Sequence, residues 1–315
     1  MSKIQDALQK IQKNRGDTPK ARPARSSEPD ASQSVVIAAL VSGDEESEYN
    51  GKRLHVDQRA LRDAALIAPE YHVQLFANQY REIKRPLIAH AFGKRATRVE
   101  LGHLIMICSA LSGEGKTFTS INLALSMAQE RDHQVLLVDA DVAKPHISDL
   151  FGAQGEPGLL DALEDTSIDP RTLILPTDLP GLSILPAGSP RANATELLAS
   201  SAMQNVTRLL GSLTEGQIVL FDSPPLLQTT EAKVLADLAG QVVVVVRAGS
   251  TPQEAVKAAL ASIDQSKPVN MILNQARGNS GHKPYGYGYG SGGSVNEEVA
   301  SNAPDADSVE SGESH

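Results

Sequence analysis

Short apolar runs alternate with amphipathic stretches between residues 103 and 278. The runs read as buried strands, and the stretches between them have helical spacing. The predicted strands are LIMICSA (104–110), QVLLVDA (134–140), LSILPAG (182–188), QIVLFDS (217–223), QVVVVVRA (241–248) and VNMILNQ (269–275). Helices are predicted near 116–131, 195–212, 229–238 and 252–265. This alternation predicts an α/β fold, a mostly parallel central sheet with helices on both faces.

The N-terminal part has a different pattern. Residues 1–13 form a predicted short amphipathic helix with Ile4, Leu8 and Ile11 on one face. A frayed helix and a helix that docks on a partner or a membrane surface both fit that pattern. Residues 14–70 are rich in Pro, Ser, Arg and acidic residues, which predicts a largely disordered linker.

The folded domain is predicted to span residues 71–278. It opens with a helix over 71–92, and Pro86 is expected to bend or end that helix. Residues 279–315 are Gly, Ser, Asn and acidic residues with few aliphatic side chains, which predicts a disordered tail.

Composition narrows the class of protein. The chain is 41% hydrophobic but only 3% aromatic, so its core is expected to be aliphatic, as in a sheet covered on both faces. The formal net charge of -9 argues against nucleic acid as a partner. The one cysteine, Cys108, is expected to be buried, and it fits a reducing compartment. With no apolar run of about 18 residues and no secretory pattern, the expected location is the cytoplasm.

The strongest chemical signal is ALSGEGKT, from Ala110 to Thr117, placed after a strand and before a helix. This is the context of a phosphate-binding P-loop. Glycines let backbone N–H groups close around phosphate oxygens, and the helix N-terminus adds a favourable dipole. Lys116 is expected to reach the β- and γ-phosphates of ATP, and the Thr117 hydroxyl is expected to bind Mg²⁺.

Three aspartates follow predicted strands. VLLVDAD ends in Asp139 and Asp141, and IVLFDSPP carries Asp222, as in a Walker B strand. Ligands of open parallel sheets bind beyond the carboxyl ends of the strands, which places these carboxylates beside the P-loop. They could hold Mg²⁺, and one could accept a hydroxyl proton. Asp141 could instead cap the next turn.

A tyrosine cluster lies in the tail: Tyr285, Tyr287 and Tyr289, separated by glycines. It could be low-complexity sequence, or it could supply phosphoacceptor hydroxyls on a tether beside the nucleotide site.

The order ALSGEGKT, VLLVDADVAKP, VLFDSPP and then tyrosines resembles the bacterial tyrosine kinases (BY-kinases) of polysaccharide loci. LSILPAG, NATELLAS and NQYREIKRPL are most similar to the exosortase-associated autokinase branch. The resemblance covers residues 71–290 well and 1–13 loosely. It implies a P-loop NTPase fold of the MinD/ParA type and an ATP-dependent tyrosine autokinase that phosphorylates its own tail and regulates exopolysaccharide biosynthesis or export.

The resemblance also implies roles for individual residues. Lys116, Asp139 and Asp141 would be catalytic, with the identity of the base left open between the two aspartates. Mg²⁺ would be held by Thr117, Asp139 and Asp222. The expected nucleotide-binding residues are Gly113, Glu114, Gly115, Lys116, Thr117, Phe118 and, at the adenine, Asn274.

Partners follow from the same resemblance. Relatives form rings in which each tail enters a neighbouring active site, and a membrane chain-length-determinant (polysaccharide co-polymerase) protein acts as activator. The chain would then associate peripherally with the inner membrane. The family's ring helix reads Glu-x-x-Arg-x-x-Arg, whereas this chain has Asn78, Arg81 and Lys84, which leaves the oligomer size open.

Two other functions fit parts of the sequence. A MinD/ParA-type ATPase switch would hydrolyse ATP without kinase activity, but its P-loop carries an additional lysine where this chain has Leu111. A regulatory module could bind nucleotide and transfer nothing, but it would not need the complete set of Lys116, Thr117 and three aspartates.

Overall fold

The computed structural model describes residues 52–212 and 216–276. The predicted helix over 1–13, most of the predicted linker and the whole tail with Tyr285, Tyr287 and Tyr289 lie outside these residues. Among the residues that the structure describes, none of the helices combines the length and apolarity that a membrane crossing requires.

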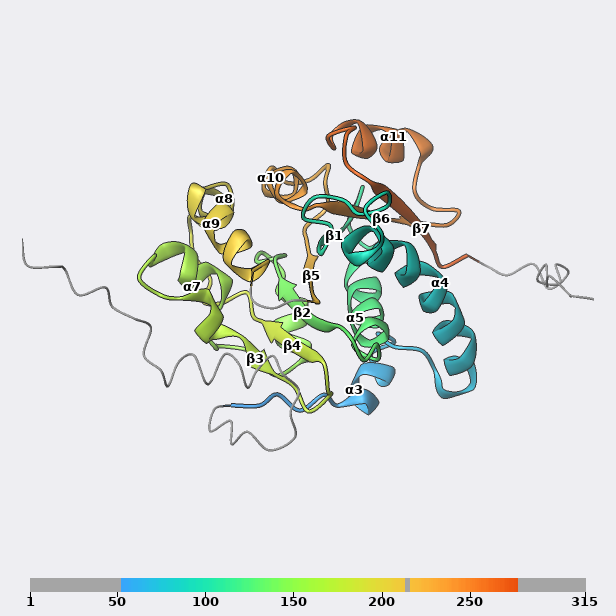
Figure 1. Ribbon diagram of the computed structural model, residues 1–315, viewed down its shortest axis with the longest axis horizontal. Helices are drawn as coiled ribbons and strands as arrows, with labels where there is room; N and C mark the ends of the chain where they lie inside the picture. The colour runs from blue at the N-terminus through green and yellow to red at the C-terminus, as the bar shows by residue number, and fades with distance from the viewer. Residues whose placement is uncertain (1–51, 213–215, 277–315) are drawn as a thin grey trace, which may run out of the picture. The chain divides into compact units, whose positions relative to one another are not determined.

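A seven-stranded sheet forms the centre of the domain, in the order β3-β4-β2-β5-β1-β6-β7 (Figure 1). The strands are β1 Leu104–Ser109, β2 Gln134–Asp139, β3 Leu175–Pro176, β4 Leu182–Leu185, β5 Gln217–Asp222, β6 Gln241–Arg247 and β7 Val269–Asn274. All neighbouring strands are parallel except β3 and β4. The predicted mostly parallel α/β sheet is therefore confirmed, and each predicted apolar run contains a strand.

Helices cover both faces of the sheet. The α-helices are α3 Gln58–Asp63, α4 Val73–Phe92, α5 Lys116–Met127, α6 His146–Leu150, α7 Leu159–Glu164, α8 Ala194–Leu198, α9 Ser201–Leu210, α10 Glu231–Leu238 and α11 Gln253–Ala261, with short 3-10 turns at Glu70–His72 and Pro170–Leu173. One apolar cluster joins one face of the sheet to α3, α4, α5 and α6, and a second joins the other face to α7, α8, α9, α10 and α11.

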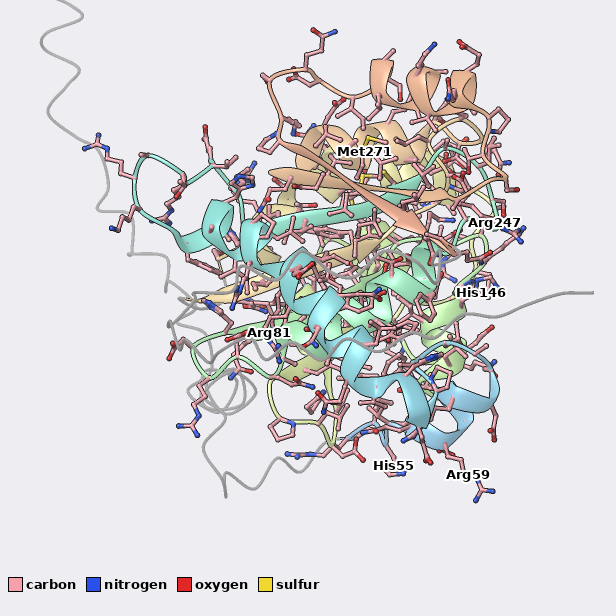
Figure 2. The ribbon with its side chains drawn as sticks, turned by 90° about the vertical axis from the view of Figure 1, so that its right-hand side faces the viewer. His55, Arg59, Arg81, His146, Arg247 and Met271 are labelled. Carbon is pink, nitrogen blue, oxygen red and sulfur yellow. The ribbon has the colours of Figure 1, made fainter. Side chains whose placement is uncertain are left out.

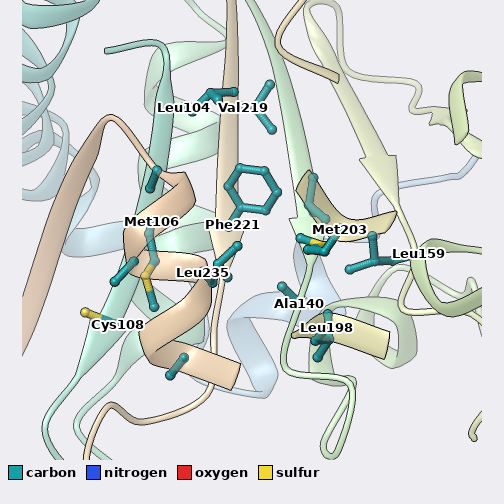
Figure 3. Packing of buried hydrophobic residues seen from close by; sticks show 14 of the residues in the cluster. Leu104, Met106, Cys108, Ala140, Leu159, Leu198, Met203, Val219, Phe221 and Leu235 are labelled. Atoms are coloured by element: carbon teal, nitrogen blue, oxygen red, sulfur yellow. The ribbon is translucent and has the colours of Figure 1, made fainter. Parts of the chain in front are cut away.

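Alternate residues of each central strand point into opposite clusters. Ile105 and Ile107 of β1 belong to the α4–α5 side, whereas Met106 and Cys108 belong to the other side. Figure 3 shows Met106 with the ring of Phe221 in the second cluster. Cys108 is completely buried, as expected, and burial raises the pKa of its thiol.

The folded domain begins earlier than the predicted boundary at residue 71. Leu54 donates its backbone N–H to Pro176 O at 2.8 Å and forms a parallel bridge with Thr177. Val56 and Leu61 are buried in the same cluster as α4 and α5. The linker prediction is wrong for residues 52–70, because a few well-placed apolar residues anchor a segment whose average composition is polar.

This packing leads to a stability prediction. Leu61→Ala should lower the free energy of unfolding by about 2–4 kcal/mol, since the side chain is 2% exposed and its removal leaves a cavity. Leu209→Ala, at a leucine that is 39% exposed, is the matched control and should cost much less. Urea denaturation measures both. Equal costs would show that the buried Leu61 contributes no more to stability than an exposed leucine.

Helix α4 is anchored to α5. Pro86 lies inside α4, which continues to Phe92, so the expectation that Pro86 could end the helix is wrong. Lys84 is buried and donates from Nζ to Ser126 O at 2.5 Å, and it also pairs with Glu130 at 2.7 Å. Arg81 Nη1 donates to Asn78 Oδ1 at 2.8 Å on the exposed side of the helix (Figure 2). Lys84, which stands at the last position of the family's ring-forming motif, therefore makes contacts within its own chain.

Candidate active site

The P-loop connects β1 to α5 at the carboxyl edge of the sheet. Gly113 and Gly115 adopt φ of 80° and 95°, values that favour glycine. Lys116 and Thr117 begin α5 directly after Gly115, the N-cap of that helix. The first N–H groups of a helix have no partner within it, so those of Lys116, Thr117 and Phe118 are available for an anion. The chain here has the strand–loop–helix geometry of the predicted P-loop.

Two of the predicted aspartates lie side by side. Asp139 ends β2 and Asp222 ends β5, and the two are register partners on adjacent strands. Thr117 Oγ1 donates to Asp222 Oδ2 at 2.8 Å, which joins the P-loop helix to the end of β5. Ser120, one helical turn after Lys116, donates to Asp222 Oδ1 at 2.8 Å. The structure therefore brings together the P-loop and both strand-ending carboxylates.

Hydrogen bonds from Ser148 hold one of the two carboxylate oxygens of Asp139. Its Oδ2 accepts hydrogen bonds from Ser148 N at 2.8 Å and Ser148 Oγ at 2.7 Å. Ser148 Oγ in turn accepts from Ala187 N at 3.0 Å. Within the described part of the chain, the buried Oδ1 of Asp139 has no hydrogen-bond partner. A buried carboxylate oxygen of this kind is suited to a ligand, because leaving it unpaired costs free energy.

Burial raises the pKa of all three aspartates. Desolvation raises the pKa of Asp139 to about 7, and the nearby charges of Asp222 and Asp141 add to that effect. Desolvation raises the pKa of Asp222 to about 6, against the hydrogen bonds from Ser120 and Thr117. Asp141 is half-buried, and desolvation also raises its pKa, partly offset by the charge of Lys116. Clustered perturbed carboxylates of this kind are typical of functional sites.

The oxygen ligands fit Mg²⁺ bound together with a phosphate. Thr117, Asp139 and Asp222 present hydroxyl and carboxylate oxygens, the ligands that Mg²⁺ prefers. Within residues 52–212 and 216–276, no group of three or more His, Cys, Asp or Glu side chains could hold a metal ion. Mg²⁺ usually binds through one or two protein ligands and completes its shell with phosphate oxygens and water. These oxygens therefore suit Mg²⁺ that arrives together with a nucleotide.

Three predicted nucleotide-binding residues have other contacts as well. Asn274 lies beside the P-loop, where its Nδ2 donates to Glu114 O at 2.9 Å. Glu114 turns its carboxylate inward, and Oε2 accepts from Leu111 N at 2.7 Å. The Phe118 ring packs edge-on against Phe76 of α4, with 6.1 Å between ring centroids. Any nucleotide contact of Glu114 or Phe118 would thus come from its backbone.

Sequence reasoning missed Ser120, Ser148 and Thr251. Ser120 lies four residues after Lys116 on α5, so helical spacing could have indicated it. Ser148, which holds Asp139, and Thr251, whose hydroxyl donates to the Glu114 carboxylate, reach the site only through tertiary packing. His146 and Arg247, after β2 and at the end of β6, lie toward the same side of the domain (Figure 2).

Comparison with known proteins is consistent with this geometry. A family model described as ParA, NUBPL iron-transfer P-loop NTPase, matches residues 100–276. Fold and site thus define a P-loop NTPase of the ParA type. The kinase domain of VpsO is 31% identical, with a TM-score of 0.51, and the match covers 64% of this chain and 99% of that domain.

Similarity to individual proteins identifies the family within the P-loop NTPases. The tyrosine-protein kinase YwqD of Bacillus subtilis is 34% identical over 186 residues, 58% of this chain and 76% of YwqD. The chain therefore belongs to the bacterial tyrosine-protein kinase family. The tyrosine-protein kinase ptk of Acinetobacter johnsonii is 32% identical over 181 residues, 56% of this chain but only 24% of that protein. The chain thus matches a small part of some relatives and most of others.

Proposed function

We propose that this protein transfers the γ-phosphoryl group of ATP to tyrosine hydroxyls, including those of its own Tyr285, Tyr287 and Tyr289. The observation that carries the proposal is the pairing of Asp139 with Asp222 beside Thr117 on the P-loop, in a chain of the tyrosine kinase family. Phosphoryl transfer requires mainly positioning and charge neutralisation, which this set of residues provides.

Each residue has a part in the proposed reaction. P-loop N–H groups and Lys116 would hold the β- and γ-phosphates. Thr117, Asp139 and Asp222 would hold Mg²⁺, which would supply neutralising charge at the phosphate oxygens. The acceptor phenol oxygen forms a bond to the γ-phosphorus while the bond to the β–γ bridging oxygen breaks, and ADP leaves. The phenol proton passes to a carboxylate.

Asp141 is the better placed of the two candidate bases. Asp139 is completely buried and its Oδ2 is occupied by Ser148, so an acceptor entering from solvent would not reach it. Asp141 is half-buried, two residues beyond the strand end. We therefore assign Asp141 as the base and Asp139 as a ligand of the metal or of its bound water.

The biological setting is proposed from the family. We expect the kinase to regulate exopolysaccharide biosynthesis or export, within the exosortase-associated branch. A membrane co-polymerase protein would activate it at the inner membrane, with the kinase itself in the cytoplasm. A ring of subunits would bring each tail to a neighbouring active site, although Lys84 is engaged with Ser126 and Glu130 of its own chain.

A tail variant tests the acceptor assignment. The Tyr285/Tyr287/Tyr289→Phe triple should lose at least about tenfold of the phosphotyrosine formed with Mg-ATP, because the acceptor hydroxyls are gone. Its affinity for Mg-ADP should equal that of the wild type, since Lys116 and the aspartates are intact. Mass spectrometry of the labelled protein measures the first quantity and calorimetry the second.

The control for this test is Tyr80→Phe, because Tyr80 is a buried tyrosine of α4. Undiminished phosphotyrosine in the triple variant would place the acceptors elsewhere. ATP hydrolysis without phosphotyrosine in the wild type, even with the membrane partner present, would favour the ATPase switch.

A further inference from the structure

The P-loop is tied to the last part of the domain through one residue, Glu114. Thr251, in the loop between β6 and α11, donates its hydroxyl to Glu114 Oε1. Asn274, at the end of β7, donates its Nδ2 to Glu114 O at 2.9 Å. These contacts join residues that are 137 and 160 positions apart in the sequence. Both the side chain and the backbone of Glu114 are therefore fixed by elements distant in sequence.

The Glu114 carboxylate is buried, with 3% of the residue exposed. None of the ion pairs in the described part of the chain includes it. Its charge is instead met by two hydrogen bonds, from Leu111 N at 2.7 Å and from the Thr251 hydroxyl. A buried carboxylate that loses one of two partners is costly, so the loop would rearrange to reach other donors.

The bond from Leu111 N closes the P-loop on itself. It spans three residues, from the start of the loop to Glu114, and thereby fixes the turn that contains Gly113. The N–H groups that follow on α5 begin only two residues later, at Lys116. The orientation of Glu114 therefore sets the shape of the loop that would surround a phosphate.

The Thr251 hydroxyl is itself held in place. Its Oγ1 accepts from Arg247 N at 3.0 Å, so the proton of the hydroxyl is directed to Glu114. The P-loop also fits closely against Asn274, because a Cβ on Gly115 would lie 2.0 Å from Asn274 Nδ2. There is little room for the P-loop to move independently of the β6–α11 loop and the end of β7.

We propose that Glu114 and Thr251 form a positioning pair that holds the P-loop in its phosphate-binding conformation. Thr251 acts through Glu114, and Glu114 acts through Leu111. A preorganised set of donors binds an anion more tightly than a loop that must first be ordered. The inference rests on nucleotide binding at the proposed site but not on transfer to tyrosine.

The test compares Thr251→Val, which keeps the shape but removes the hydroxyl, with Thr251→Ser, which restores it. Thr251→Val should weaken Mg-ADP binding and raise KM for ATP, each by about tenfold, with kcat within about twofold of the wild type. Thr251→Ser should bind within about twofold of the wild type. Thr172→Val is the matched control, because Thr172 is exposed and donates to Asp169 O at 2.7 Å.

Glu114→Gln is the second variant, in case Thr251→Val does not fold, and it should also weaken Mg-ADP binding by about tenfold. Wild-type affinity in either folded variant would overturn the proposal. A variant with a lower kcat and a lower melting temperature but an unchanged KM would also overturn the proposal, since a purely structural contact would act in that way. A wild type that binds no Mg-ADP also overturns it, whereas one that binds Mg-ADP without forming phosphotyrosine removes only the kinase proposal.

Discussion

Lys116→Met is expected to lower the rate of tyrosine phosphorylation at saturating Mg-ATP by at least about 10²–10³-fold. Lys116 is 7% exposed at the first position of α5, and its charge lowers the pKa of both Asp222 and Asp141. Methionine keeps the length of the side chain but removes the positive charge that we propose contacts the γ-phosphate. It also removes a positive charge that stabilises the ionised forms of Asp141 and Asp222. Quantitative phosphotyrosine analysis over time measures the rate.

The matched control is Lys257→Met, at an exposed lysine of α11 that pairs with Glu254 at 2.9 Å. Its rate should stay within about twofold of the wild type, since surface ion pairs contribute little. A Lys116→Met protein that is folded and retains a tenth or more of the wild-type rate would contradict the role assigned to Lys116.

Asp139→Asn is expected to have two opposite effects. Phosphorylation should fall by about 10²-fold or more, because the amide cannot replace a carboxylate beside Mg²⁺. The nucleotide-free protein should become more stable at pH 8, because burying the ionised Asp139 is costly. The shift of its pKa from 3.8 to about 7 sets a ceiling of roughly 4 kcal/mol on that gain.

The pH dependence follows from the direction of the shift. A folded-state pKa above the unfolded value means that the folded protein binds more protons between pH 3.8 and about 7. The contribution of Asp139 to stability is therefore present at low pH and is lost as the pH rises through about 7. The excess in free energy of unfolding of Asp139→Asn over the wild type should therefore be smaller at pH 5 than at pH 8. In the wild type, kcat/KM should rise with pH through the same region as Asp139 ionises.

Thermal unfolding of both proteins without nucleotide, at pH 5 and pH 8, measures the gap. The matched control is Asp149→Asn, because Asp149 is an exposed aspartate on the adjacent helix α6. The stability of this control should match that of the wild type at both pH values. An Asp139→Asn protein that is less stable than the wild type at pH 8 would show that burying the ionised Asp139 does not destabilise the folded state.

The sheet was predictable because its strands are continuous apolar runs. Val242–Val246 in β6 and Leu104–Cys108 in β1 are buried on both faces, and such runs are characteristic of parallel strands covered by helices. The predicted helix over 195–212 is instead two helices, because the Ser200 side chain accepts from Ala202 N and begins a new one. The anchoring of residues 52–70 depends on Leu54, Val56 and Leu61, which are too few to stand out from a polar composition.

The chemistry of the site was predictable to the extent that it is local in sequence. Gly113, Lys116 and Thr117 form one motif, and Asp139 and Asp222 each end a recognisable strand. The partners that fix these groups lie outside the motifs: Ser148, nine residues further on, holds Asp139, and the distant Thr251 and Asn274 hold Glu114. Contacts between residues more than a hundred positions apart follow from the strand order, which periodicity alone does not give.

We propose that the γ-phosphoryl group is transferred to tyrosine rather than to water. The most direct measurement incubates the full chain with Mg-ATP, with and without the cytoplasmic segment of a membrane co-polymerase, and quantifies phosphotyrosine and free phosphate in the same samples. We expect phosphotyrosine at Tyr285, Tyr287 and Tyr289 in the wild type and none in Lys116→Met. Release of phosphate with no phosphotyrosine under either condition would contradict it.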